Sequence, residues 1–264
     1  MRKNYLDAKK IIIKVGTSTL TYPNGKLNLL RIERLSMVIS DLINKGKEVV
    51  LVSSGAIGVG ATKLGFSEKP ESVCERQASA AIGQAALMQI YQSFFSNYNI
   101  HIAQILLTKE DTYDNERRQN AINTFRALMR YGVLPIVNAN DTISTDEIGF
   151  SDNDNLSAVV AVLLEADLLV ILTDIDALYD KNPKEFPDAK PIHEVHEIND
   201  EIINMAGDKG SSFGTGGMLT KISAASLCLE NGVDMAIIDG SEPLHINDVI
   251  EGQNIGTLFI GGTK

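Results

Sequence analysis

Short apolar runs alternate with longer segments of helical periodicity along the whole chain. The predicted strands cover residues 11–15, 48–52, 101–107, 133–138, 168–173, 235–239 and 256–260. Apolar residues at helical spacing predict helices over residues 27–44, 76–95, 116–130, 152–165 and 218–230. Strands that are apolar along their length and separated by helices are typical of a largely parallel sheet buried on both faces. The pattern therefore predicts an α/β fold, a three-layer αβα sandwich around that sheet.

Small and polar residues follow four of the predicted strands. The motifs are Gly16-Thr17-Ser18, Ser53-Ser54-Gly55-Ala56, Asn138-Ala139-Asn140-Asp141 and Thr173-Asp174. Each alone is compatible with an ordinary turn between a strand and a helix, since these residue types are common there. Because the carboxyl ends of parallel strands meet at one edge of a sheet, the four motifs together predict a continuous polar cleft for a ligand.

Lys14 lies inside the first apolar strand. Burying an ammonium group is costly unless an anion meets it, so this lysine indicates a cation directed at a phosphate. The alternative is that the first strand lies at an edge of the sheet and that Lys14 faces water.

The segment 210–221 is glycine-rich and precedes a predicted helix. Gly214, Gly216 and Gly217 allow the backbone to approach an oxyanion closely, and the helix N-terminus adds partial positive charge. Lys221 follows in the first turn or so of that helix. The alternative is a flexible linker that caps the helix. The chain contains neither a Walker A motif nor a G-x-G-x-x-G motif, so the residues predict a phosphate cradle of another kind.

Three polar residues begin the helix predicted over 152–165. Asp152 is a suitable N-cap. Asn153 and Asp154 are then available to point into the cleft, where one would bind substrate and the other would order the lysines. The alternative is that all three serve only to cap the helix.

The composition is that of an ordinary globular protein, with 44% apolar and 22% charged residues among 264. A net charge of −10 argues against a nucleic-acid partner, although local lysines still permit a small anionic substrate. The two cysteines, Cys74 and Cys228, have no metal-binding spacing, and the N-terminal residues contain no apolar signal segment. These features predict a cytoplasmic protein.

Taken together, the motifs resemble those of the glutamate 5-kinases, a branch of the amino acid kinase family, in the family's order and over almost the whole chain. The resemblance implies ATP-dependent phosphorylation of the γ-carboxylate of L-glutamate, the first step of proline biosynthesis. It also implies one amino acid kinase domain over residues 1–264, in which roughly 1–165 bind the amino acid and roughly 166–264 bind ATP. Many family members carry glutamate at the position of Ala139, and bacterial members often continue into a PUA domain that is not expected here.

The resemblance assigns roles residue by residue. Lys14, Asp154 and Lys221 are implied as catalytic. The implied ATP-binding residues are Lys14, Thr173, Asp174, Thr215, Gly216, Gly217, Met218, Leu219, Thr220 and Lys221. The implied glutamate-binding residues are Ser54, Gly55, Ala56, Asn138, Asp141 and Asn153. Mg²⁺ is expected to be bound mainly through the ATP phosphates, without a metal site of the protein's own.

Further expectations follow from the resemblance alone: a homodimer or homotetramer, a functional link to glutamyl phosphate reductase, and inhibition by proline through residues 142–150. Three alternatives stay open at the level of the sequence. The first is a related kinase that acts on acetylglutamate, aspartate, carbamate or UMP. The second is an amino-acid sensor without turnover, and the third is an RNA-binding module, which the acidic charge disfavours.

Overall fold

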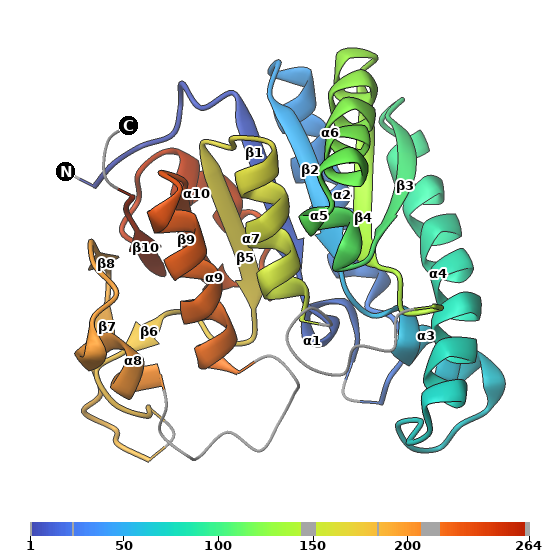
Figure 1. Cartoon of the computed structure of the whole chain (residues 1–264). Coiled ribbons are helices and arrows are strands. Elements are labelled where there is room, and N and C mark those ends of the chain that lie inside the picture. Colours follow the sequence, from blue (N-terminus) through green and yellow to red (C-terminus); the bar gives the residue numbers. More distant parts are fainter. Residues whose placement is uncertain (1, 23, 144–151, 184, 207–216, 262–264) are drawn as a thin grey trace.

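The centre of the molecule is an eight-stranded sheet with the strand order β3-β4-β2-β1-β5-β9-β10-β8, which crosses Figure 1 from right to left. The computed structural model describes residues 2–22, 24–143, 152–183, 185–206 and 217–261. Within these residues, all neighbouring strands of the sheet run parallel except β9 and β10. The strands are β1 (Lys10–Val15), β2 (Glu48–Ser53), β3 (His101–Leu107), β4 (Val133–Ala139), β5 (Leu168–Thr173), β8 (Glu194–Val195), β9 (Asp234–Asp239) and β10 (Thr257–Phe259). A separate hairpin-like pair is formed by β6 (Leu178–Tyr179) and β7 (Pro191–Ile192).

Helices cover both faces of this sheet. One face packs against α2 (Leu29–Asn44), α4 (Val73–Ser96) and α10 (His245–Ile250). The other face packs against α6 (Asn115–Arg130), α7 (Asn153–Leu163) and α9 (Met218–Glu230). The shorter helices are α1 (Thr17–Leu20), α3 (Ala56–Leu64), α5 (Glu110–Tyr113) and α8 (Asp200–Ala206). The predicted three-layer αβα sandwich with a largely parallel sheet is therefore confirmed.

The apolar strands supply both cores at once because successive side chains point to opposite faces. In β1, Ile11 and Ile13 enter the core beneath α2 and α4. Ile12, between them, enters the core beneath α7 and α9. All three side chains are fully buried, which explains why the central strands are apolar along their whole length instead of alternating.

Two glycines let α3 and α4 touch backbone to backbone. A Cβ atom added at Gly60 would lie 1.8 Å from the carbonyl oxygen of Ser79. One added at Gly83 would lie 1.7 Å from the carbonyl oxygen of Ala56. Neither distance is compatible with a side chain. The contact holds the first turn of α3, which directly follows the Ser54-Gly55 motif, against the middle of α4.

The first described residues are attached to the last ones through Asp234 at the start of β9. Its buried carboxylate accepts a hydrogen bond from Tyr5 Oη at 2.6 Å and pairs with Lys3 Nζ at 2.5 Å. The backbone nitrogen of Gly261 donates to the same carboxylate at 2.9 Å. Tyr5 N also donates to the carbonyl oxygen of Ile250 at 2.8 Å. No helix in the described part of the chain is long and apolar enough to cross a membrane.

Candidate active site

Lys14 lies on the central strand of the sheet. Strand β1 is flanked by β2 and β5, and Lys14 is in register with Val52 on one side and Ile171 on the other. Its side chain is only 7% exposed. An edge position facing water is therefore wrong for Lys14, and the lysine requires an anionic partner inside the protein.

Asp154, in the first turn of α7, supplies that partner and binds a second lysine as well. Its Oδ1 lies 2.5 Å from Lys14 Nζ and its Oδ2 lies 3.0 Å from Lys221 Nζ. Lys221 is 3% exposed and the Asp154 side chain is fully buried. Burial alone would raise the pKa of Asp154, but the two lysines outweigh burial and hold that pKa below its usual value. The carboxylate is therefore ionised and links both ammonium groups.

The start of α9 brings Lys221 to this carboxylate. Gly217 is the N-cap residue with φ −70° and ψ 179°, an extended conformation that needs no left-handed backbone. Thr220 Oγ1 donates to Asp154 Oδ2 at 2.9 Å, so two consecutive residues of α9 contact the same carboxylate. Met218 is half-buried, and Leu219 is exposed. Thr215, Gly216 and the earlier part of the glycine-rich segment lie outside the described residues.

Thr173 and Asp174 lie at the carboxyl end of β5, the strand next to Lys14. Thr173 is buried and Asp174 is exposed. The Thr173 hydroxyl donates to Asp174 Oδ1 at 3.1 Å, and the Thr173 carbonyl accepts from Gly240 N at 2.7 Å. The pair thus places an acidic side chain at the rim of the same sheet edge.

The residues predicted to bind the amino acid meet beyond the ends of β2 and β4. Gly55 is the N-cap of α3 and has φ +101°, a left-handed conformation that side chains disfavour. This turn separates Ser54 from the buried Ala56 at the start of α3. Asn153 Nδ2 lies 2.8 Å from Ser54 Oγ and 3.0 Å from Asn138 Oδ1. Three motifs that are far apart in the sequence therefore converge on one amide group.

The second polar atom of the Asn153 side chain, Oδ1, has a different environment from Nδ2. Its Oδ1 is buried and has no hydrogen-bond partner among the described residues. The same is true of Oδ2 of Asp152, while its Oδ1 accepts from the backbone nitrogen of Asp154 as an N-cap. Burial and then the charge of Asp154 raise the pKa of Asp152. The buried Oδ1 of Asn153 is thus an acceptor available to a ligand that brings a hydrogen-bond donor.

Asp141 lies two residues beyond the end of β4 and is partly buried. Burial raises its pKa to about 6, and the charge of Arg76 opposes this rise. A carboxylate that is costly to ionise in the free protein gains from a cationic ligand, because the ligand would restore the lost solvation. Ala139 is buried in the core beneath α6 and α7.

Two further side chains of α4 reach this site and were not predicted. Asn138 Nδ2 donates to Gln84 Oε1 at 2.9 Å. Tyr91 Oη lies 2.8 Å from Ser53 Oγ. Both residues lie on the buried face of α4, seven positions and hence about two helical turns apart. The sequence did contain a signal for Gln84: helical periodicity assigns this polar residue to the buried face of the helix.

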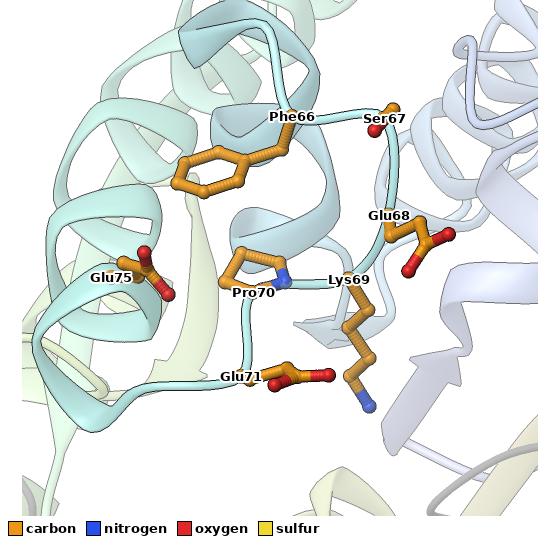
Figure 2. Close-up of a pocket in the computed structure, with 7 residues that line it drawn as sticks. All are labelled: Phe66, Ser67, Glu68, Lys69, Pro70, Glu71 and Glu75. Atoms are coloured by element: carbon orange, nitrogen blue, oxygen red, sulfur yellow. The ribbon is translucent and has the colours of Figure 1, made fainter.

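Two cavities lie outside the cluster of predicted site residues. The one in Figure 2, about 260 Å³, is lined by residues 66–71 of the α3–α4 connection and by Glu75 in the first turn of α4, and none of the predicted site residues lines it. Another, about 350 Å³, lies beyond the ends of β5 and β9 and is lined in part by Asp176, Asp239 and His245. The described residues contain no group of three histidine, cysteine or acidic side chains arranged to hold a metal ion.

The chain is similar to known proteins over almost its whole length. A family model described as the amino acid kinase family matches residues 9–239. The chain is 55% identical over 265 residues to a glutamate 5-kinase of Clostridium perfringens, and the match covers 98% of each chain. It is 49% identical over 262 residues to a glutamate 5-kinase of Lactococcus lactis, covering 98% of this chain and 97% of the relative. A solved carbamate kinase from Giardia lamblia bound to AMP-PNP shares the fold with a TM-score of 0.68 at 17% identity, over 97% of this chain and all of that one.

Proposed function

The chain belongs to the amino acid kinase family, and we propose that it transfers the γ-phosphoryl group of ATP to the γ-carboxylate of L-glutamate. The observation that carries this function is the convergence of two site halves at one sheet edge. One half is the Lys14–Asp154–Lys221 triad, and the other is the cluster of Ser54, Asn138 and Asn153. Residues 153 and 154 are consecutive in α7, so the helix joins the two halves directly.

The nucleophile needs no general base. A γ-carboxylate with a reference pKa of about 4.3 is already ionised at neutral pH, so no proton has to be removed from it before attack. The γ-carboxylate oxygen attacks the γ-phosphorus, the bond to the bridging oxygen breaks, and ADP leaves. What the protein must supply is alignment and stabilisation of charge on the transferring group.

The lysine triad is suited to that task. Each ammonium group carries three donor hydrogens, which suit it to bind phosphoryl oxygens. Two cations on one carboxylate leave the triad with a net positive charge, which attracts the transferring phosphoryl group and the carboxylate that attacks it. Asp154 sets the direction of both ammonium groups and, by attracting both, holds the two mutually repelling cations close together.

The Ser54–Asn153 pair offers complementary groups to an amino acid. Asn153 Nδ2 donates to Ser54 Oγ, so the hydroxyl hydrogen of Ser54 remains available for a carboxylate. Two acceptors are available for an α-ammonium group. They are Oδ1 of Asn153 and the carboxylate of Asp141, which lies two residues beyond the end of β4. One donor and two acceptors match the zwitterionic end of free glutamate.

The nucleotide is assigned to the other half, around Thr173, Asp174 and residues 215–221. We assign residues 1–165 mainly to amino-acid binding and residues 166–264 mainly to ATP binding. Mg²⁺ enters as part of the MgATP substrate, since it favours phosphate oxygens and retained waters over protein ligands. The cavity beyond β5 and β9 has room for part of a nucleoside and opens at the same sheet edge.

A hydroxamate assay tests this function. Hydroxylamine traps an acyl phosphate, so the protein incubated with glutamate, ATP and Mg²⁺ should form γ-glutamyl hydroxamate, and omission of either substrate should abolish the product. A panel with aspartate, acetylglutamate, carbamate and UMP as acceptors gives the control. Phosphorylation of UMP or carbamate without activity on glutamate would refute the proposal.

The wider role follows from the product. An acyl phosphate hydrolyses and cyclises readily, so a functional link to glutamyl phosphate reductase in proline biosynthesis fits its chemistry. Inhibition by proline is proposed through residues 142–150, most of which lie outside the described part of the chain. A cytoplasmic homodimer or homotetramer is proposed from the family likeness, and analytical ultracentrifugation would test the oligomeric state.

A further inference from the structure

We propose that Gln84 is a positioning residue that orients Asn138 and, through it, the amide of Asn153 toward the amino-acid substrate. This inference rests on the proposed function and concerns the binding of glutamate, not the chemical step. It is carried by a chain of three buried amides, Gln84, Asn138 and Asn153, which are 6%, 2% and 9% exposed.

The direction of each amide follows from one backbone group. The nitrogen of Ala139 donates to Asn138 Oδ1 at 2.9 Å, and a backbone N–H can only donate. Oδ1 of Asn138 must therefore face Ala139 N and Asn153 Nδ2, and Nδ2 of Asn138 must point the other way. There it meets Gln84 Oε1 at 2.9 Å, an acceptor as the geometry requires.

The same reasoning extends to the substrate side. Because Asn153 turns its Nδ2 toward Asn138 Oδ1 and Ser54 Oγ, its Oδ1 is the atom left for a ligand. If Asn138 lost its partner at Gln84, one hydrogen of its buried amide would have no acceptor. Because an unsatisfied buried donor is costly, the amide of Asn138 would rotate toward another acceptor. Rotation of Asn138 would remove one of the acceptors that hold Asn153 in place.

The fold keeps Gln84 at this position through its neighbours in α4. Gly83 lies against the carbonyl oxygen of Ala56 in the first turn of α3, and Tyr91 contacts Ser53 at the end of β2. One face of α4 therefore touches the ends of β2 and β4 together. This arrangement makes α4 a support for both amino-acid motifs, although none of its residues belongs to them.

The experiment compares Gln84→Met with the wild type in the hydroxamate assay. Methionine has a similar length but no comparable acceptor. We expect the KM for glutamate to rise about tenfold, the scale of leaving one buried hydrogen-bond partner unsatisfied, with the KM for ATP within about twofold and kcat within about threefold. Gln92→Met is the matched control, because Gln92 is exposed on the same helix, and it should leave all three parameters unchanged.

A double-mutant cycle separates positioning from a general loss of structure. Adding Gln84→Met to an Asn153→Ala variant should raise the KM for glutamate no further, since Gln84 acts through Asn153. Fully additive effects, an equal rise in both KM values, or an unchanged KM for glutamate would each overturn the inference. If Gln84→Met does not fold, Gln84→Asn, which keeps an amide but is too short for the contact, carries the same expectation. A wild type that forms no γ-glutamyl hydroxamate would overturn the proposed function first and this inference with it.

Discussion

Substitution of Asp154 by asparagine removes one charge while keeping the size of the side chain, and it leaves two buried lysines facing each other. The perturbation can be estimated from the distances. At an effective dielectric constant of about 20, unit charges at the 2.5 Å and 3.0 Å separations from Lys14 and Lys221 attract by roughly 7 and 6 kcal/mol. Most of this attraction offsets the cost of burying the three charges. Breaking a buried ion pair by removing one partner typically lowers stability by about 3–5 kcal/mol.

We therefore expect Asp154→Asn to lower the free energy of unfolding by about 3–5 kcal/mol in urea denaturation at pH 7. Each kcal/mol corresponds to roughly 2–4 °C in Tm for chains of about this size, so Tm should fall by roughly 6–20 °C. Because the pKa of Asp154 is lowered in the folded state, its contribution is fully present above its ordinary pKa. The difference between wild type and variant should persist from pH 8 to pH 5, begin to shrink as the pH falls below the ordinary value, and be lost once the pH has fallen through the lowered one.

Asp152→Asn is the matched control for this experiment. The two aspartates are two residues apart, and asparagine is as good an N-cap as aspartate. Burial and the charge of Asp154 raise the pKa of Asp152, so removing its charge should leave stability at pH 7 unchanged or increase it. A stable Asp154→Asn variant, or equal losses in both variants, would refute the view that Asp154 holds two charged lysines.

Three further predictions concern activity and packing. Lys14→Ala and Lys221→Ala should each lower kcat by at least ~100-fold, the scale of losing one transition-state donor, and near-wild-type single-turnover rates would contradict the two-lysine mechanism. With its pKa raised to about 6, Asp141 should lose its charge as the pH falls through that value. The kcat/KM for glutamate of the wild type should therefore drop below about pH 6, whereas that of Asp141→Asn should be low at every pH. A flat wild-type profile would exclude this role. Gly83→Ala would place a Cβ 1.7 Å from the carbonyl oxygen of Ala56. It should lower the free energy of unfolding by about 1–3 kcal/mol and raise the KM for glutamate. An unchanged Tm would show that α3 and α4 pack less closely than this distance implies.

The sequence predicted the large elements well because burial sets their patterns. The helix predicted over residues 218–230 has the same bounds in the structure, and the strand over 101–107 does too. The helix α3 was not predicted, because Gly58 and Gly60 obscure its periodicity and the reason for Gly60 is a contact with α4. The short strands β6, β7 and β8 carry only two residues each, too few to show any period.

The site was predictable where residue chemistry is unusual for its place. A lysine in an apolar strand and three polar residues at a helix start pointed to Lys14, Asn153 and Asp154. The contribution of α4 was not predictable in this way, because Gln84 acts through its contact with Asn138 on β4. That contact depends on how α4 packs against the sheet. Its signal exists only once β4 and α4 are placed beside each other.

The attachment of the chain's first residues to Asp234 has a consequence during synthesis. The partners of Tyr5 at positions 234 and 250 are synthesised only after some 230 further residues. At about 5–20 residues per second, roughly 10–50 s pass before they can meet. Strand β1 likewise has no neighbour on one side until β5, about 157 residues further along the chain, has been made. The strand that carries Lys14 therefore keeps one unpaired edge until β5 has been made, which makes the nascent chain a natural client for chaperones that cover exposed strand edges.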